Sequence, residues 1–201
     1  MRLRPRHLRR YREIVEILAD RGFGALLTQL GISERLNLPR RWIRRQPIPE
    51  DELTLPIRAR TTLEDLGPTF VKLGQILSTR SDLIPPEYLA ELRRLQDDVS
   101  PLSWDVIKPE IEKELGRSVN QLFLEIDPVP IASASLAQVH AARLPNGSQV
   151  IVKVLRPGIE ETVKLDLDIL YDLAQLAEER TSLGNRYDLM DLAEEYSFAL
   201  K

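Results

Sequence analysis

The stretch IASASLAQVHAARLPNGSQVIVKVLRPG, residues 131–158, decides the fold of this chain. The helical period gives way to short runs rich in apolar residues, SLAQVHAARL at 135–144 and QVIVKVL at 149–155, which are typical of β-strands. Between these runs lies Pro145-Asn146-Gly147-Ser148, a turn signal typical of β-hairpins. A third run, LFLEI at residues 122–126, precedes them. The sequence therefore predicts three strands within residues 120–155.

Small residues lead into this hairpin at a spacing that glycines have in protein kinases. Protein kinases cover the phosphates of ATP with G-x-G-x-x-G-x-V and place a phosphate-contacting lysine on the third strand. Alanines and a valine take those four fixed positions here, and a lysine ends the string Val-Ile-Val-Lys at residues 150–153. The candidate nucleotide-binding residues are Ala132, Ser133, Ala134, Ser135, Ala137, Val139 and Lys153.

The alanines change what this loop can do. Glycine lets a backbone approach phosphate oxygens closely, whereas the Cβ of alanine fills part of that space. We therefore expect the loop to cover a nucleotide in a different pose, with a poor fit to ordinary protein phosphorylation. Because Lys153 lies between Val152 and Val154, we expect its ammonium to be partly buried and to need an anionic partner. The alternative is a plain β-meander with a surface lysine, and His140 is interpreted as a packed strand histidine.

Helical patterns lie on both sides of the hairpin. Residues 57–116 have helical periodicity, as do residues 159–180 and 187–201. Pro68 and Pro86 fit first helical positions, and Gly116 fits a C-terminal cap. Pro109 is expected to kink or split its helix.

The N-terminal part is basic, although the whole chain has a net charge of -3. Residues 9–32 predict a basic amphipathic helix, and residues 36–56 a proline-rich linker. Such an arm is suited to lipid headgroups or nucleic acid, or is simply a solvated helix face. Nucleic acid is disfavoured because the remainder is acidic and no aromatic residues interleave with the basic ones. The absence of cysteine excludes disulfides and thiolate metal sites, and no metal site is predicted.

A second pattern stands in LGPTFVKLGQILSTR, residues 66–80. Lys72 and Gln75 are three residues apart and so share one face of the predicted helix. Gly74 lies between them, where a glycine costs about 1 kcal/mol relative to alanine. A close approach to another backbone, or a functional need, would explain it.

Taken together, these motifs resemble the UbiB/AarF family of atypical protein-kinase-like proteins, which is associated with ubiquinone and other isoprenoid-quinone metabolism. The resemblance rests on Lys72-Leu73-Gly74-Gln75 as the K-x-G-Q motif, on the alanine-rich loop, and on Lys153, in this order. It covers most of the chain, clearly from about residue 57 onward.

The resemblance implies an α+β fold: a truncated protein-kinase-like small lobe, an antiparallel sheet plus helices, preceded by a helical N-terminal extension. It implies that Lys72 and Gln75 are regulatory residues occluding the would-be substrate site, and that Lys153 contacts the phosphates. ATP and Mg²⁺ would be bound between two lobes. It further implies an ATPase or small-molecule kinase that is cytoplasmic and peripheral to the inner membrane, with a lipid surface or quinone-biosynthesis proteins as partners.

Several parts of a kinase are not found in this sequence. A kinase needs an acid on its αC helix, an Asp base and Asn in its catalytic loop, and a DFG aspartate. The resemblance puts the acid in an E-x-D motif beyond the AEEY segment, where this chain stops, and Glu125-Ile126-Asp127 is interpreted as a coincidence at a strand end. We therefore expect an N-terminal portion that is inactive alone, with residues 1–56, 57–119 and 120–201 as its three segments. The competing hypothesis is a non-catalytic membrane- or partner-binding scaffold that uses the basic helix.

Overall fold

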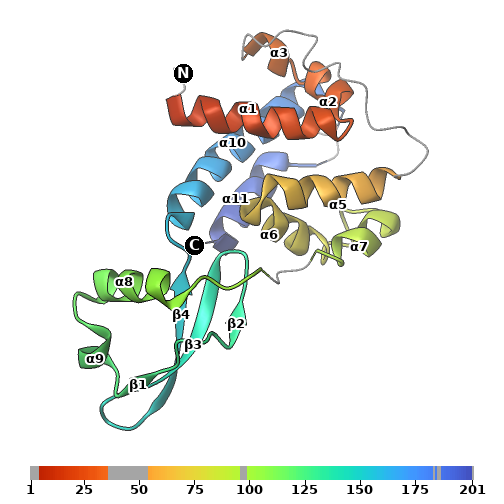
Figure 1. Ribbon diagram of the computed structural model, residues 1–201. Helices are drawn as coiled ribbons and strands as arrows, with labels where there is room; N and C mark the ends of the chain where they lie inside the picture. Colours follow the sequence, from red (N-terminus) through yellow and green to blue (C-terminus); the bar gives the residue numbers. More distant parts are fainter. Residues whose placement is uncertain (1–4, 36–53, 96–98, 183, 185–186, 201) are drawn as a thin grey trace. The chain divides into compact units, whose positions relative to one another are not determined.

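A computed structural model describes residues 5–35, 54–95, 99–182, 184 and 187–200 (Figure 1). The helices are α1 (Pro5–Asp20), α2 (Gly24–Gln29), α3 (Ile32–Arg35), α5 (Leu55–Leu66), α6 (Pro68–Leu77), α7 (Pro86–Leu92), α8 (Trp104–Leu115), α9 (Val119–Leu122), α10 (Ile159–Arg180) and α11 (Leu189–Leu200). The strands are β1 (Glu125–Ile126), β2 (Ala132–Ser133), β3 (Ala137–Arg143) and β4 (Gln149–Leu155). This mixture of helices and antiparallel sheet confirms the predicted α+β class.

The chain divides into two compact units. The helical unit comprises residues 1–95 and 162–201, and the sheet unit comprises residues 96–161. Most of α10 and all of α11 belong to the helical unit together with the N-terminal helices, and the three segments expected from the sequence stay a prediction. The proline-rich linker falls mostly outside the described residues.

In the sheet unit, β3 is the central strand. It pairs antiparallel with β4 from Ala137↔Leu155 to Arg143↔Gln149, and its other edge pairs with β2 and β1 in turn. The predicted hairpin is confirmed, with Gly147 at φ 85° in its turn. The predicted strand at residues 122–126 is shorter than expected, because α9 extends to Leu122 and only Glu125–Ile126 pair with β3.

One face of this sheet is covered by helix. Val150, Val152 and Val154 of β4 pack with Ile107 and Ile111 of α8 in one apolar cluster. Gln149, Ile151, Lys153 and Leu155 alternate with these valines and are exposed. The period-two pattern of β4 therefore separates a packed face from an open face.

Two predictions made from the sequence, at Gly116 and at Pro109, concern helix α8. It ends with Gly116 in the left-handed region at φ 66°, as predicted. Of the expected kink or split at Pro109, the split is wrong because the helix continues through this residue, and a kink stays a prediction. Proline removes only one intrahelical bond, to the carbonyl of exposed Asp105, where water can replace the lost donor.

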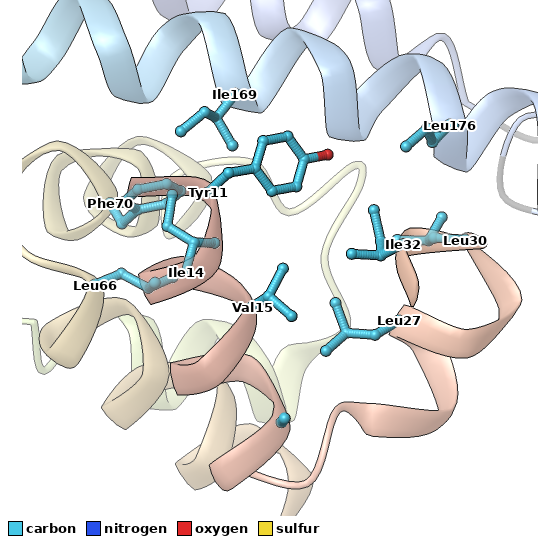
Figure 2. Packing of buried hydrophobic residues seen from close by; sticks show 11 residues of the cluster. Tyr11, Ile14, Val15, Leu27, Leu30, Ile32, Leu66, Phe70, Ile169 and Leu176 are labelled. Atoms are coloured by element: carbon cyan, nitrogen blue, oxygen red, sulfur yellow. The ribbon is translucent and has the colours of Figure 1, made fainter. Parts of the chain in front are cut away.

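In the helical unit, the apolar face of α1 lies inside the core (Figure 2). Figure 2 shows Ile169 of α10 beside the ring of Tyr11, and Ile14 beside Phe70 and Leu66. Because this face packs against other helices, α1 is a core helix whose polar side alone meets solvent. Its amphipathic pattern is thus explained by packing within the unit.

A buried ion pair joins α1 to α10. Nε of Arg10 donates to Oδ1 of Asp166 at 2.7 Å, and Nη2 donates to the carbonyl oxygen of Leu66 at 2.6 Å. Asp166 has no exposed surface. Burial lowers the pKa of Arg10, but the hydrogen bonds and charges of Asp166 and, after it, Glu13 outweigh burial, and the net pKa is raised. One arginine counted in the basic arm is therefore a structural residue.

Candidate functional site

The candidate site lies on the open face of the sheet. Val139 is paired with Ala132 on one side and with Lys153 on the other. Residues directly opposite each other in antiparallel strands point to the same face. The register therefore aligns the side chains of Ala132, Val139 and Lys153 in one row, on the face opposite the α8 cluster.

Lys153 is exposed. The expectation of a partly buried ammonium is therefore wrong. Because the lysine is exposed, the need of a buried charge for an anionic partner does not apply to it. The reason is the alternation of β4, which turns Val152 and Val154 toward α8 and turns Lys153 away from them. Its ammonium is open to an anion approaching the sheet from solvent.

The alanine-rich loop is a tight hairpin between β2 and β3. The backbone N–H of Ala134 donates to the carbonyl of Ala137 at 2.8 Å, which leaves Ser135 and Leu136 at the tip. Ala137 and Ser135 are buried, whereas Ala132 is exposed. The loop is therefore a defined turn that connects β2 to β3 beside the Leu155 end of β4.

Arg156 is a residue of this site that the sequence reasoning missed. Its Nε donates to the carbonyl of Ala134 at 3.0 Å, and its Nη2 donates to Oγ of Ser133 at 2.9 Å. Its backbone N–H donates to the carbonyl of Leu136 at 2.9 Å. The signal available in the sequence was its place three residues after Lys153, in the string RPG that follows β4.

His140 lies on the packed face and is fully buried. Its Nδ1 lies 2.8 Å from the carbonyl oxygen of Asp127, so Nδ1 carries the proton. Nε2 then accepts from Nε2 of Gln138 at 2.9 Å, and Gln138 also bonds both backbone groups of Leu102. The interpretation as a packed strand histidine is confirmed.

The K-x-G-Q residues belong to the helical unit, on α6. Nε2 of Gln75 donates to the carbonyl of Leu95 at 3.4 Å, and Lys72 is half-buried. A Cβ at Gly74 would lie 2.2 Å from Cδ1 of Leu95. The atoms nearest to this position belong to leucine side chains, so Gly74 permits close side-chain packing rather than the backbone approach expected from the sequence. The structure places Lys72 and Gln75 in one unit and the loop with Lys153 in the other. Their roles in catalysis and binding stay predictions.

The helix α6 is also tied to α11. Oη of Tyr196 donates to the carbonyl of Thr69, and Tyr196 is buried. Burial, and after it the negative charge of Asp166, raises the pKa of Tyr196 well above its ordinary value. The phenol therefore stays protonated and keeps donating at neutral pH.

Among the described residues, no three His, Asp or Glu side chains are grouped so that they could hold a metal ion. Glu125 and Asp127 are exposed at β1 and its end. The backbone N–H of Val129 donates to Oδ1 of Asp127 at 2.9 Å, a local turn contact. No helix within the described ranges has the length and apolar character needed to cross a membrane.

Comparison with known proteins identifies the family. The family model described as "ABC1 atypical kinase-like domain" matches residues 94–201, more than half of the chain. The chain belongs to the ABC1 atypical kinase-like family. The match spans the whole sheet unit from β1 to β4 together with α10 and α11, so the candidate loop and Lys153 lie inside the ABC1 domain.

Relatives agree with this assignment. The chain is similar to "Probable protein kinase UbiB" of Marinobacter nauticus, with 49% identity over 148 residues, which are 74% of this chain and 27% of that protein. It is 45% identical to the protein of the same name from Pseudomonas aeruginosa over 159 residues, 79% of this chain and 29% of that protein. It is also 45% identical to the one from Azotobacter vinelandii over 159 residues, with the same shares. The chain thus spans less than a third of the length of these relatives.

Proposed function

We propose that this ABC1-family chain is the N-terminal part of an atypical kinase-like ATPase that binds ATP. The observation that carries the proposal is the row of Ala132, Val139 and Lys153 on the open face of the sheet, inside the matched domain. The chain by itself is proposed to be inactive. The full-length protein is proposed to support isoprenoid-quinone biosynthesis or lipid homeostasis, peripheral to the inner membrane.

Each residue has a distinct part in the proposed binding. The ammonium of Lys153 pairs with phosphate oxygens, and it is accessible because β4 directs it away from α8. The small side chains of Ala132 and Val139 leave room for a ligand above the strands beside it. The hairpin tip at Ser135 and Leu136 lies beyond the paired residues of β2 and β3 and is proposed to cover the phosphates.

ATP and Mg²⁺ fit these residues to different degrees. The open, cationic sheet face suits the triphosphate. Mg²⁺ prefers carboxylate, phosphate and water oxygens, and the described residues supply no grouped carboxylates for it. Bound Mg²⁺ would neutralise phosphate charge, and its protein ligands are proposed to come from outside this chain. Lys72 and Gln75 are proposed as regulatory residues of the same protein.

Titration of the full-length protein with MgATP tests the proposal. Hydrogen bonds between charged groups contribute about 1.5–3 kcal/mol, so Lys153→Ala is expected to weaken ATP binding by roughly 10-fold to 150-fold. Lys108→Ala is the matched control, because Lys108 is an exposed lysine on α8, on the opposite face. An unchanged affinity in Lys153→Ala, or an equal loss in both variants, would refute the proposal.

The scaffold hypothesis remains a second candidate, limited to a membrane contact through the exposed arginines of α1. The apolar face of α1 is packed in the core, so insertion of this face into a bilayer would require the helical unit to open. Arg9 and Arg12 are exposed, whereas Arg10 is bound to Asp166. Co-sedimentation with anionic liposomes should therefore compare the wild type with Arg9→Gln and Arg12→Gln together. Loss of binding in this double variant supports a membrane-facing arm, and retained binding removes it.

A further inference from the structure

The side chain of Arg156 bonds both to the alanine-rich hairpin and to a segment that is distant in sequence. Its guanidinium donates to Ala134 and Ser133 in the hairpin, and its Nη2 also donates to the carbonyl of Ser100 at 3.0 Å. Ser100 belongs to the segment that leads into α8, far from the hairpin in sequence. A single side chain therefore joins the hairpin to a second part of the sheet unit.

The hairpin is also held by backbone bonds of its own, from the N–H of Ile131 to the carbonyl of Val139 and from the N–H of Ala134 to the carbonyl of Ala137. Strand β2 has only the two residues Ala132 and Ser133, and a strand of this length supplies few ladder bonds. The tip residues Ser135 and Leu136 lie beyond it. The backbone N–H of Arg156 donates to the carbonyl of Leu136, so the same residue holds the tip through its main chain and the strand through its side chain.

The chemistry of the guanidinium suits this role. Arginine presents several N–H donors in a rigid plane, whereas lysine is a compact point charge on a flexible stem. Here the donors Nε and Nη2 are directed to three acceptors that belong to the hairpin and to Ser100. Charge alone would not fix three separate oxygens at once. The planar set of N–H donors on this guanidinium, its fork, therefore determines where the backbone of residues 133–136 lies above the sheet.

We propose that Arg156 is a positioning residue that holds the alanine-rich hairpin in the pose from which it covers nucleotide phosphates. Glycines in such a loop would let the backbone adjust to the ligand, whereas a loop of alanines held by Arg156 is fixed before the ligand arrives. The inference rests on the proposed function for its ligand. Its structural half, the fixing of the hairpin, is independent of any nucleotide.

Amide hydrogen exchange of the 201-residue chain tests the structural half. Arg156→Lys keeps the charge and removes the fork, and is expected to speed exchange at the amide of Ala134 by about tenfold, the loss of roughly 1.4 kcal/mol of local protection. Amides in the β3–β4 ladder should keep the wild-type rate. Ser133→Ala removes one acceptor without altering the arginine, and should give a smaller change in the same direction. Arg143→Lys, an exposed arginine of β3, is the matched control and should change nothing.

Nucleotide titration of the full-length protein tests the ligand half. Arg156→Lys is expected to weaken MgATP about tenfold while leaving adenosine within about twofold, because adenosine has no phosphates for the hairpin to cover. Equal losses for both ligands would show a general structural role and overturn the proposal. Wild-type exchange at Ala134 in Arg156→Lys would overturn it regardless of nucleotide results. An unchanged ATP affinity in Lys153→Ala would instead overturn the proposed function, so the two failures are distinguishable.

Discussion

Replacement of Gly74 by alanine tests how closely α6 packs in the helical unit. A Cβ at this position would lie 2.2 Å from Cδ1 of Leu95 and 2.7 Å from Cδ1 of Leu63. Carbon atoms in good contact are about 3.5–4.0 Å apart, so both leucines would have to move. Leu95 is buried, which leaves it little room to do so.

Two effects of opposite sign decide the magnitude. Overpacking a core costs about 1–3 kcal/mol, and the displacement of two leucines puts Gly74→Ala near the upper end. Alanine is favoured over glycine inside a helix by about 1 kcal/mol. The expected net loss in the free energy of unfolding is therefore about 2 kcal/mol. For a chain of this size such a loss lowers the midpoint of thermal unfolding by roughly 4–8 °C.

Guanidinium unfolding followed by circular dichroism at the helical band measures this change. The same substitution in a Leu95→Ala background provides the control, because the shortened side chain removes the closest contact. Gly74→Ala should then lose the part of its cost that comes from Leu95, while the contact with Leu63 remains, giving a coupling free energy of about 1 kcal/mol. A Gly74→Ala protein as stable as the wild type, with no coupling to Leu95, would refute the packing argument and leave a purely functional reason for this glycine.

Two further predictions concern ion pairs of the helical unit. Arg10→Met should lower the free energy of unfolding by about 3–5 kcal/mol, because it leaves the buried carboxylate of Asp166 without its cation. Arg12→Met, on the exposed side of α1, is the control and should change this free energy by no more than about 0.5 kcal/mol. Similar losses for the two variants in denaturant titrations would contradict the prediction. The hydrogen bond from Arg60 is the main cause that lowers the pKa of Glu91, so ionised Glu91 stabilises the folded state above the unfolded pKa of about 4.3. This contribution is lost as pH falls through the lower folded pKa, and urea unfolding between about pH 3 and pH 6 should show a flatter profile for Glu91→Gln than for the wild type. A Glu91→Gln profile that matches the wild type would show that the pair does not contribute.

Much of the local structure could be predicted from the sequence. The hairpin of β3 and β4, the proline starts of α6 and α7, the cap at Gly116 and the long helix α10 all appear where their patterns indicated. These features depend on dihedral preferences and hydrogen bonds among neighbours in the chain. The helix continues through Pro109 because the lost bond lies on an exposed turn that tolerates it.

The candidate site could be predicted only in part. The positions of Ala132, Val139 and Lys153 followed from motif spacing, and the pairing register aligned them in one row. The exposure of Lys153 did not follow, because apolar neighbours in a strand point to the opposite face from the lysine itself. Arg156 escaped notice because its acceptors at Ser100 and Ser133 lie far from it in sequence.

The order of residues by itself determined the periods, the turns and the motifs that indicate an atypical kinase-like chain, since each of these is a property of adjacent residues. Only the tertiary structure decided that the basic helix α1 buries its apolar face, that Arg10 neutralises Asp166, and that Arg156 holds the alanine-rich hairpin. These outcomes depend on which apolar faces exclude water together. The packing of these apolar faces brings charges and donors that are distant in sequence into contact, and no short stretch of sequence is enough to predict it.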